Sequence, residues 1–210
     1  MLLYTLGDSF TYGEELPDPS KQGWATLVSE QLGYDLINRG RPGCGNNYMI
    51  KTAMKEVPKL KPDLVIVAWT SCGRMEFSDR FSVYDIWPGC QRRFEKPHPH
   101  RDTLIKYITS WNNDMHQYRG WLRSVALLQD FFKLRNINYR FLNTFDNHVL
   151  NVRYAKHSKD YIDLIDTDKF IGWPDTSMME WMGDCAKGPG GHPLELGHQR
   201  IADVVVNALK

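Results

Sequence analysis

The chain has 210 residues, of which 42% are hydrophobic and 24% charged, and its 26 basic and 25 acidic residues leave a formal net charge of +1. This length and apolar fraction suit one enzyme-sized domain over residues 1–210, and the balanced charge argues against a nucleic-acid-binding protein. No apolar stretch approaches the roughly 18 residues of a membrane span, so we expect neither a membrane nor a nucleic acid as partner.

Strand and helix patterns alternate along the sequence. We expect strands at residues 2–6, 35–38, 64–68 and 139–143, and helices at 24–32, around 50–57, around 121–132 and at the C-terminus, where Ile201, Val204, Val205 and Ala208 share one side. Such alternation is typical of a parallel sheet covered on both faces. The predicted fold is therefore a three-layer α/β/α sandwich with a central, mainly parallel sheet.

Two long segments interrupt the alternation. Residues 72–101 contain many turn-forming residues and are too long for a plain connection, so we expect an insert loop that acts as a lid or determines specificity. Residues 151–188 are expected to form a second insert loop, whose aromatic and methionine side chains would line a subsite or form a small hydrophobic cluster.

The first candidate for chemistry is Ser9. The run Gly7-Asp8-Ser9 follows the first predicted strand, so the serine hydroxyl is expected at the carboxyl edge of the sheet, where open parallel sheets bind ligands. The small Gly7 would allow a tight turn and the close approach of a substrate, and the amides after the turn would face developing negative charge. The alternative is a strand that ends in an ordinary Gly-Asp-Ser turn.

The second candidate is His192, in a glycine-rich loop just before the C-terminal helix. Together with Gly7-Asp8-Ser9, this histidine resembles the pattern of the SGNH hydrolases, also called GDSL esterases and lipases, and the resemblance spans the whole chain in a few short blocks. It implies a flavodoxin-like SGNH fold, Ser9 as nucleophile and His192 as general base. It also implies that Gly43, in the run Asn38 to Gly43, donates its amide to the oxyanion.

Two blocks depart from this family pattern. The third block of the family carries an oxyanion asparagine, but here Ser71 stands at that position, followed shortly by Arg74. A serine hydroxyl donates one hydrogen bond but rotates freely, so either Ser71 serves as a less preorganised donor or Arg74 assists.

The last block of the family reads Asp-x-x-His, yet Pro189 stands three residues before His192. The nearest upstream acid is Asp184, and a flexible loop separates it from the histidine. We therefore expect Asp184 to orient the imidazole. A Ser-His dyad with a backbone carbonyl ranks second, and Asp175 ranks third.

Other site chemistries have weaker support. His98 and His100, with Cys90 and His116, match no usual structural zinc spacing, so no metal is expected, and nothing implies a cofactor. The basic run 91–96 is expected to be a solvated loop face. The four cysteines form no Cys-x-x-Cys pair and are expected to be reduced, while His198 is a backup for His192 that is expected to face away from the pocket.

The sequence thus predicts a serine esterase that removes a small acyl group, with O-acetyl groups on carbohydrate as the first choice of substrate. The run from Trp69 to Phe77 also resembles an SGNH-like branch from viruses of bacteria. We expect a protein that is cytoplasmic on synthesis, since no leader precedes the first strand, and a place on the virion would suit the viral branch. The alternative is an eroded SGNH-like module that binds a glycan or a protein.

Overall fold

The computed structural model describes residues 1–78, 80, 82–90, 100–111 and 113–210. His98 and the basic run 91–96 lie outside the described residues. Within the described part of the chain, no helix has both the length and the apolar character that crossing a bilayer requires.

The centre of the fold is a four-stranded sheet in the order β2-β1-β3-β6, with every neighbouring pair parallel. Its strands are β1 (Leu2–Gly7), β2 (Asp35–Gly40), β3 (Leu64–Trp69) and β6 (Tyr139–Asn143). Beyond β6, a single parallel bridge joins Phe141 to Phe170. The predicted strands and their parallel arrangement are confirmed.

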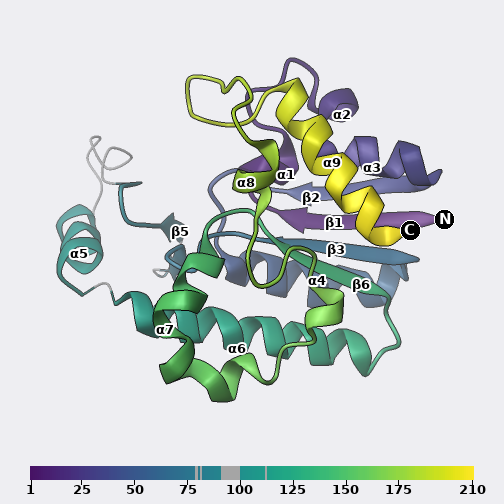
Figure 1. The fold of residues 1–210 in the computed structure, drawn as a ribbon. Helices are drawn as coiled ribbons and strands as arrows, with labels where there is room; N and C mark the ends of the chain where they lie inside the picture. Colours follow the sequence, from purple (N-terminus) through teal and green to yellow (C-terminus); the bar gives the residue numbers. More distant parts are fainter. Residues whose placement is uncertain (79, 81, 91–99, 112) are drawn as a thin grey trace.

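Helices cover both faces of the sheet (Figure 1). On one side lie α1 (Ser9–Tyr12), α2 (Pro19–Gln22), α3 (Trp24–Leu32), α8 (Met178–Met182) and α9 (Glu195–Leu209). On the other side lie α4 (Asn46–Leu60), α6 (Asp114–Lys133) and α7 (Asn147–Ile162). The predicted three-layer α/β/α sandwich is therefore confirmed.

The alternation of side chains along the buried strands produces two cores. In β3, Leu64, Ile66 and Ala68 pack with α3 and α9, whereas Val65, Val67 and Trp69 pack with α4 and α6. Every residue of β3 is buried because helices cover both faces, and this explains its continuous apolar sequence.

The carboxyl edge of the sheet is the edge that carries the candidate site. All four strands run toward it, away from the end where both termini lie (Figure 1). Helix α9 runs back across the sheet from this edge, and His192 lies just before its first residue. The α/β topology therefore brings the segment after β1 and the segment before α9 to the same edge.

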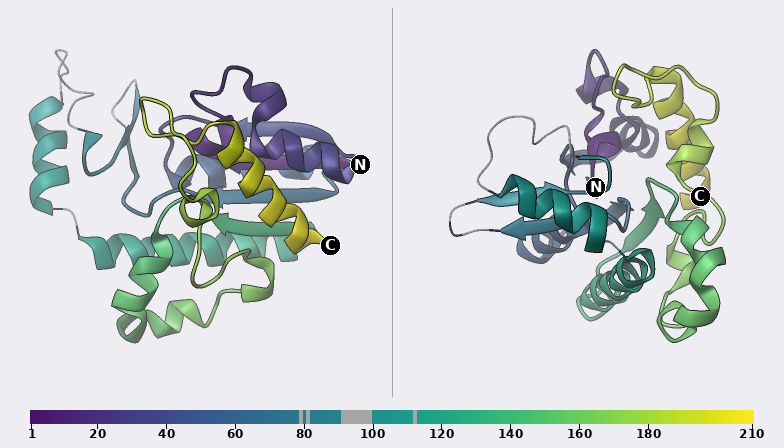
Figure 2. Two further views of the ribbon diagram at one scale, coloured as in Figure 1. Left: turned by 45° about the horizontal axis from the view of Figure 1, so that its top comes forward. Right: turned by 90° about the vertical axis from the view of Figure 1, so that its left-hand side faces the viewer.

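The first predicted insert loop is partly a folded lobe. Within residues 72–101, β4 (Met75–Ser78) and β5 (Val83–Ile86) pair as an antiparallel hairpin, and α5 (Arg101–Lys106) with the π-helix Tyr107–Trp111 follows. This lobe has its own buried cluster of Ile86, Cys90, Leu104 and Ile108. Figure 2 shows α5 projecting from the end of the sandwich opposite the termini.

The prediction of a second insert loop is wrong over residues 151–162, because these residues belong to α7. Among the α7 residues whose side chains the structure describes, Tyr154, Tyr161 and Ile162 are only partly buried, and Ser158 is buried. The apolar stripe was therefore too weak to indicate a helix. After α7 the chain forms a 3₁₀ turn (Thr167–Lys169) and α8, and the remainder is irregular up to Gly188.

Candidate active site

Ser9 is the first residue of α1, directly after the carboxyl end of β1. Asp8 caps this short helix, because its Oδ1 accepts a hydrogen bond from the Phe10 amide at 3.1 Å. The role predicted for Gly7 needs a correction. A Cβ at Gly7 would lie 1.9 Å from Thr11 Oγ1, so this glycine makes room for α1 rather than for a substrate.

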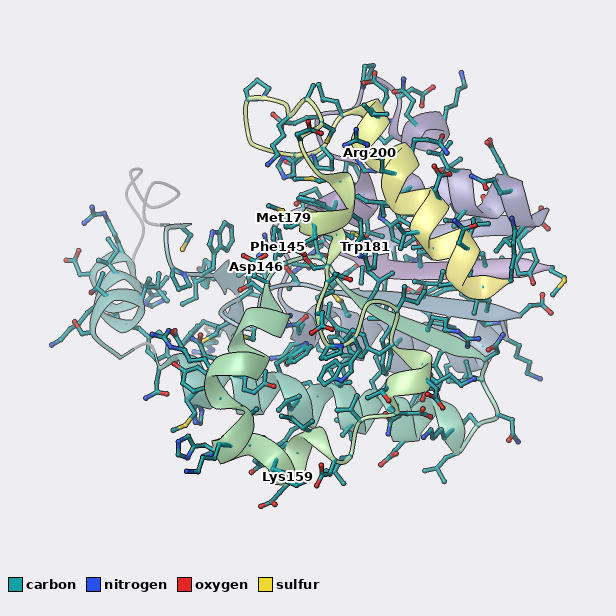
Figure 3. The ribbon with its side chains drawn as sticks, in the orientation of Figure 1. Phe145, Asp146, Lys159, Met179, Trp181 and Arg200 are labelled. Carbon is teal, nitrogen blue, oxygen red and sulfur yellow. The ribbon has the colours of Figure 1, made fainter. Side chains whose placement is uncertain are left out.

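Ser9 and His192 line one cavity of about 340 Å³. Its lining residues come from seven segments of the chain: Ser9, Phe10 and Glu14; Gly43; Arg74; Trp87; Phe145; Met179; and Gly190, Gly191 and His192. Figure 3 shows Phe145 and Met179 close together at this edge of the sheet. The structure therefore brings together the two residues that the sequence places at opposite ends of the chain.

Glu15 is the carboxylate that holds the His192 ring. Its Oε2 lies 2.8 Å from His192 Nδ1 and also accepts from the His192 amide at 3.1 Å, while Oε1 accepts from the Gly190 amide at 2.6 Å. These hydrogen bonds hold the pKa of Glu15 below its ordinary value, so the side chain is a carboxylate near neutral pH. A carboxylate on Nδ1 fixes the tautomer in which Nε2 is free to accept a proton.

The backbone around Glu15 is built for this contact. Glu15 itself has a φ of +72°, a left-handed conformation that costs free energy in a residue other than glycine. A Cβ at Gly188 would lie 2.6 Å from the Glu15 carboxyl carbon, and one at Gly190 would lie 3.2 Å from it. The glycine-rich loop is therefore needed to let the Glu15 carboxylate approach the backbone.

The expectation that Asp184 orients the imidazole is wrong. Its side chain is 96% exposed, and its Oδ1 accepts from Arg200 at 3.1 Å. Figure 3 shows Arg200 on α9, and Arg200 is not among the residues that line the cavity. Neither a backbone carbonyl nor Asp175 takes the position on Nδ1, because Glu15 occupies it.

Sequence reasoning missed Glu15 because the search for an acid was confined to the residues before His192. The available signal was the pair Glu14-Glu15, five and six residues after Ser9 at the same edge of the sheet. Three glycines, Gly188, Gly190 and Gly191, lie within four residues of His192. A loop so rich in glycine indicates that a side chain from another segment packs closely against its backbone.

The second nitrogen of the His192 ring also faces a carboxylate. Nε2 lies 3.2 Å from Glu14 Oε2, and the Glu14 side chain is 40% exposed. In the structure as described, the Ser9 hydroxyl makes no hydrogen bond to His192. Because Ser9, Glu14 and His192 line the same cavity, Glu14 and the Ser9 hydroxyl are alternative partners for Nε2.

Backbone amides supply candidate donors for an oxyanion. Gly43 is buried, has a φ of +74° and lines the cavity with Ser9. In the described part of the chain, the amides of Gly43 and Ser9 donate to no protein acceptor. The amide of Ser9 is free because it belongs to the first turn of α1. Both amides are thus available to a ligand in the cavity.

Arg74 brings a positive charge to the same cavity. Its guanidinium lies over the rings of Trp87 and Phe145, at 5.1 and 5.0 Å from their centroids, and NH1 lies 3.5 Å from Asp8 Oδ2. Asp8 is fully buried and also accepts from Thr70 Oγ1 at 2.5 Å. Burial raises the pKa of Asp8, and the charge of Arg74 opposes that rise.

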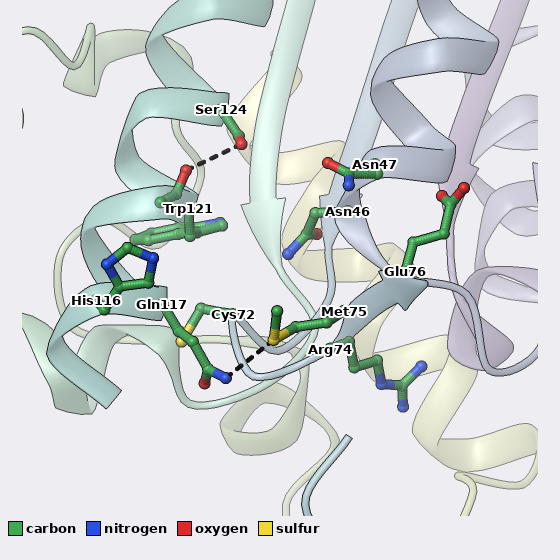
Figure 4. Close-up of a pocket in the computed structure, with 11 residues that line it drawn as sticks. Asn46, Asn47, Cys72, Arg74, Met75, Glu76, His116, Gln117, Trp121 and Ser124 are labelled. Atoms are coloured by element: carbon green, nitrogen blue, oxygen red, sulfur yellow. Dashed lines mark hydrogen bonds between the residues drawn. The ribbon is translucent and has the colours of Figure 1, made fainter. Parts of the chain in front are cut away.

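Ser71 does not line this cavity. It lines an adjoining one with Arg74 and Trp87, and its Oγ accepts from the Gly73 amide at 3.2 Å. A third hollow, of about 200 Å³, lies between α4, β4 and α6. Figure 4 shows that the Arg74 side chain there points away from the α6 residues His116, Gln117 and Trp121. Arg74 lines all three hollows, and so it is the side chain that connects them.

His198 is a structural residue. It is fully buried, and its Nδ1 accepts from the Trp24 amide at the start of α3 at 3.1 Å. Burial lowers its pKa to about 4, so the ring is neutral near pH 7. Its backup role at the site is therefore excluded by position.

Cys44 and Cys72 are the cysteines that adjoin candidate site residues in the sequence. Cys44 and Cys72 are buried, and burial raises the pKa of each thiol to about 12, so both stay protonated. All four cysteines are free and buried. Among the described residues, no group of three or more histidine, cysteine or acidic side chains is arranged to hold a metal ion.

The sequence matches no protein-family model and no curated protein. Solved structures, however, match over nearly the whole chain. Esterase EstA from Pseudoalteromonas sp. has a TM-score of 0.57 at 14% identity, and the match covers 99% of this chain and 96% of that one. A member of the lipolytic protein G-D-S-L family from Veillonella parvula has a TM-score of 0.51 at 15% identity, with 99% and 97% covered.

This chain has the SGNH hydrolase fold. Acetyl xylan esterase Est2A from Butyrivibrio proteoclasticus is similar as well, with a TM-score of 0.56 at 17% identity, and the match covers 99% of this chain and 62% of that one. Within this SGNH fold, the residues that match the family blocks, Ser9, Gly43 and His192, line one cavity. The carboxylate on the histidine comes instead from Glu15, at the opposite end of the chain.

Proposed function

We propose that this protein is a serine esterase that acts through Ser9, His192 and Glu15. The observation that carries the proposal is that Ser9, Gly43 and His192 line one cavity while Glu15 lies 2.8 Å from Nδ1 of the histidine. A serine hydroxyl, an imidazole and a carboxylate that orients the imidazole are the parts of a nucleophilic acyl-transfer site.

In the proposed reaction, a bound ester displaces Glu14 from His192, and the proton that joined Nε2 to Glu14 leaves to solvent. The unprotonated Nε2 then turns to the Ser9 hydroxyl. Catalytic hydrogen bonds are commonly formed only in the substrate complex. Nε2 takes the proton as Ser9 Oγ attacks the acyl carbonyl, and the imidazolium that forms is stabilised by Glu15. His192 then returns the proton to the leaving alcohol. A water molecule, deprotonated by the same imidazole, attacks the acyl group on Ser9, and the imidazolium returns the proton to Ser9 Oγ as the acid product leaves.

The tetrahedral oxyanion is assigned to the amides of Ser9 and Gly43, with Arg74 as the side-chain donor. Arg74 is preferred over Ser71 because it lines the cavity that contains Ser9, whereas Ser71 lines the adjoining one. Only NH1 of Arg74 engages an acceptor among the described residues, namely Cys44 O at 3.3 Å and the Asp8 carboxylate, which leaves further N–H donors for an oxyanion.

For the substrate, we propose a small acyl ester on a carbohydrate. Trp87 and Phe145 line the cavity, and aromatic side chains are common where proteins bind sugar rings. Est2A, an acetyl xylan esterase, shares the fold. A viral SGNH-like branch that modifies surface glycans would suit the same chemistry.

The test is hydrolysis of p-nitrophenyl acetate and butyrate and of acetylated xylo-oligosaccharides. We expect Ser9→Ala and His192→Ala each to lower kcat/KM by at least about 10³-fold. The matched controls are Ser20→Ala and His157→Ala, which alter exposed residues away from the cavity and should retain wild-type rates. A phosphonate ester should add to the wild type, detected by intact mass, and not to Ser9→Ala.

The alternative, a binding module, makes the opposite prediction. If the wild type neither hydrolyses esters nor forms the phosphonate adduct, while it still binds glycans, the esterase proposal is refuted. Equal hydrolysis by the wild type and both site variants would refute it as well.

A further inference from the structure

The loop that carries Gly43 is held from two sides. On the side of the sheet, the carbonyl of Gly7 accepts from the Arg41 amide at 3.0 Å and from the Cys44 thiol at 3.4 Å. On the side of the lobe, the Asp85 carboxylate of β5 accepts from the Gly45 amide at 3.1 Å and from Arg41 NH2 at 2.5 Å. Asp85 thus binds the residues on both sides of Gly43.

The Asp85 contact is a partly buried one. The Asp85 side chain is 15% exposed, and Arg41, which it pairs with, also lies over the Tyr48 ring at 4.1 Å from its centroid. A carboxylate that accepts two hydrogen bonds, one from a charged donor, holds its partners more firmly than a neutral acceptor does. The Gly43 amide donates to no acceptor among the described residues, so the positions of the neighbouring residues determine its direction.

We infer that Asp85 is a positioning residue, which aims the Gly43 amide at the oxyanion from the β4–β5 lobe. This inference rests on the proposed function, in which Gly43 is an oxyanion donor. An amide stabilises an oxyanion only when it is already directed to the place where charge develops, so a loosened loop lowers kcat more than it raises KM. The β4–β5 lobe then contributes to oxyanion stabilisation by positioning Gly43.

The hairpin offers a matched control. Glu76 stands directly opposite Asp85 in the β4–β5 ladder, and it pairs with Lys51 of α4. Figure 4 shows Glu76 reaching from β4 toward α4. Both carboxylates thus link the β4–β5 hairpin to the segment that follows β2, but only Asp85 contacts the loop that carries Gly43. Lys51→Met removes the ion pair with Glu76 and leaves the contacts of Asp85 with the Gly43 loop in place.

The experiment compares the wild type with Asp85→Ala, Asp85→Asn and Lys51→Met, using p-nitrophenyl acetate kinetics, amide hydrogen exchange of residues 41–45 and thermal unfolding. For Asp85→Ala we expect kcat to fall by about 10- to 100-fold with KM within about threefold, and exchange at 41–45 to accelerate. Asp85→Asn should recover part of kcat, because its amide oxygen still accepts from Gly45. Lys51→Met should retain the wild-type kcat.

Two results would overturn the inference, and a third would overturn the proposed function on which it rests. In an active wild type, a kcat of Asp85→Ala within twofold of the wild-type value contradicts it. So does an equal loss of kcat in Lys51→Met at an equal loss of thermal stability, since the effect would then be merely structural. A wild type without Ser9-dependent turnover contradicts the proposed function, and the exchange data then still report whether Asp85 anchors the loop.

Discussion

The contact between Glu15 and His192 gives the sharpest prediction about the site. In Glu15→Gln, the amide keeps the shape of the side chain but offers one acceptor oxygen where the carboxylate offers two. The Gly190 amide donates to one carboxylate oxygen, while the His192 amide and Nδ1 face the other. In either orientation of the glutamine, its NH₂ group therefore faces an N–H donor.

The expected loss follows from this conflict. In serine hydrolases, removing the carboxylate that orients the histidine lowers kcat by roughly 10⁴-fold, because the tautomer and the imidazolium are no longer stabilised. The Glu15 side chain is 20% exposed, so water can partly replace it. We therefore expect kcat of Glu15→Gln to fall by about 10²- to 10⁴-fold, with a smaller change in KM.

The assay is p-nitrophenyl acetate hydrolysis over about pH 6 to 9. The pKa of Glu15 lies below its ordinary value of 4.5, so the wild-type carboxylate stays ionised across this range, and the loss in Glu15→Gln should be present at every pH within it. The matched control is Asp184→Asn, the same chemical change on the acid that pairs with Arg200. It should retain the wild-type kcat.

Two outcomes would refute the reasoning. One is a Glu15→Gln enzyme within threefold of the wild type. The other is a loss of activity in Asp184→Asn that equals the loss in Glu15→Gln. Folding of each variant is checked by circular dichroism, so that a collapsed loop is not mistaken for a catalytic effect.

Further predictions concern stability and the loop. The pKa of His198 falls from 6.5 to about 4 on folding, so the unfolded chain binds a proton at His198 more readily than the folded protein does. Protonation of the unfolded chain therefore lowers the free energy of unfolding as the pH falls below 6.5. Urea unfolding should show a loss of about 2 kcal/mol by pH 5 that is absent in His198→Asn, whose Oδ1 still accepts from the Trp24 amide; an unchanged pH slope in the variant would contradict this. Gly188→Ala should displace Glu15 and lower both kcat and the melting temperature, whereas Gly120→Ala, whose Cβ meets only the end of the Arg123 side chain at 3.8 Å, should raise stability by up to about 1 kcal/mol. Equal melting temperatures for these two glycine variants would count against the packing argument. Arg74→Ala should lower kcat by about 10²-fold and Arg74→Lys by less, and steady-state kinetics that show only a KM change would contradict the oxyanion role.

The sequence by itself determined the layered fold. The continuous apolar run of β3 predicts a strand buried on both faces, and the 3.6-residue spacing in α3 and α6 predicts helices that cover them. Both signals are local, since each depends on neighbours within one element. Local features also locate Ser9 after a strand end and His192 before a helix start, whereas their predicted roles are what the resemblance to the SGNH pattern implies.

The tertiary structure alone decided which carboxylate serves the histidine. Glu15 and His192 are 177 residues apart, and no local periodicity relates them. Their contact exists because β1 and α9 meet at one edge of the sheet, and because glycines in the loop clear space for a side chain from elsewhere. The role of Asp85 is non-local for the same reason, since a hairpin that the sequence presents as a loop must fold before its carboxylate can reach the chain around Gly43.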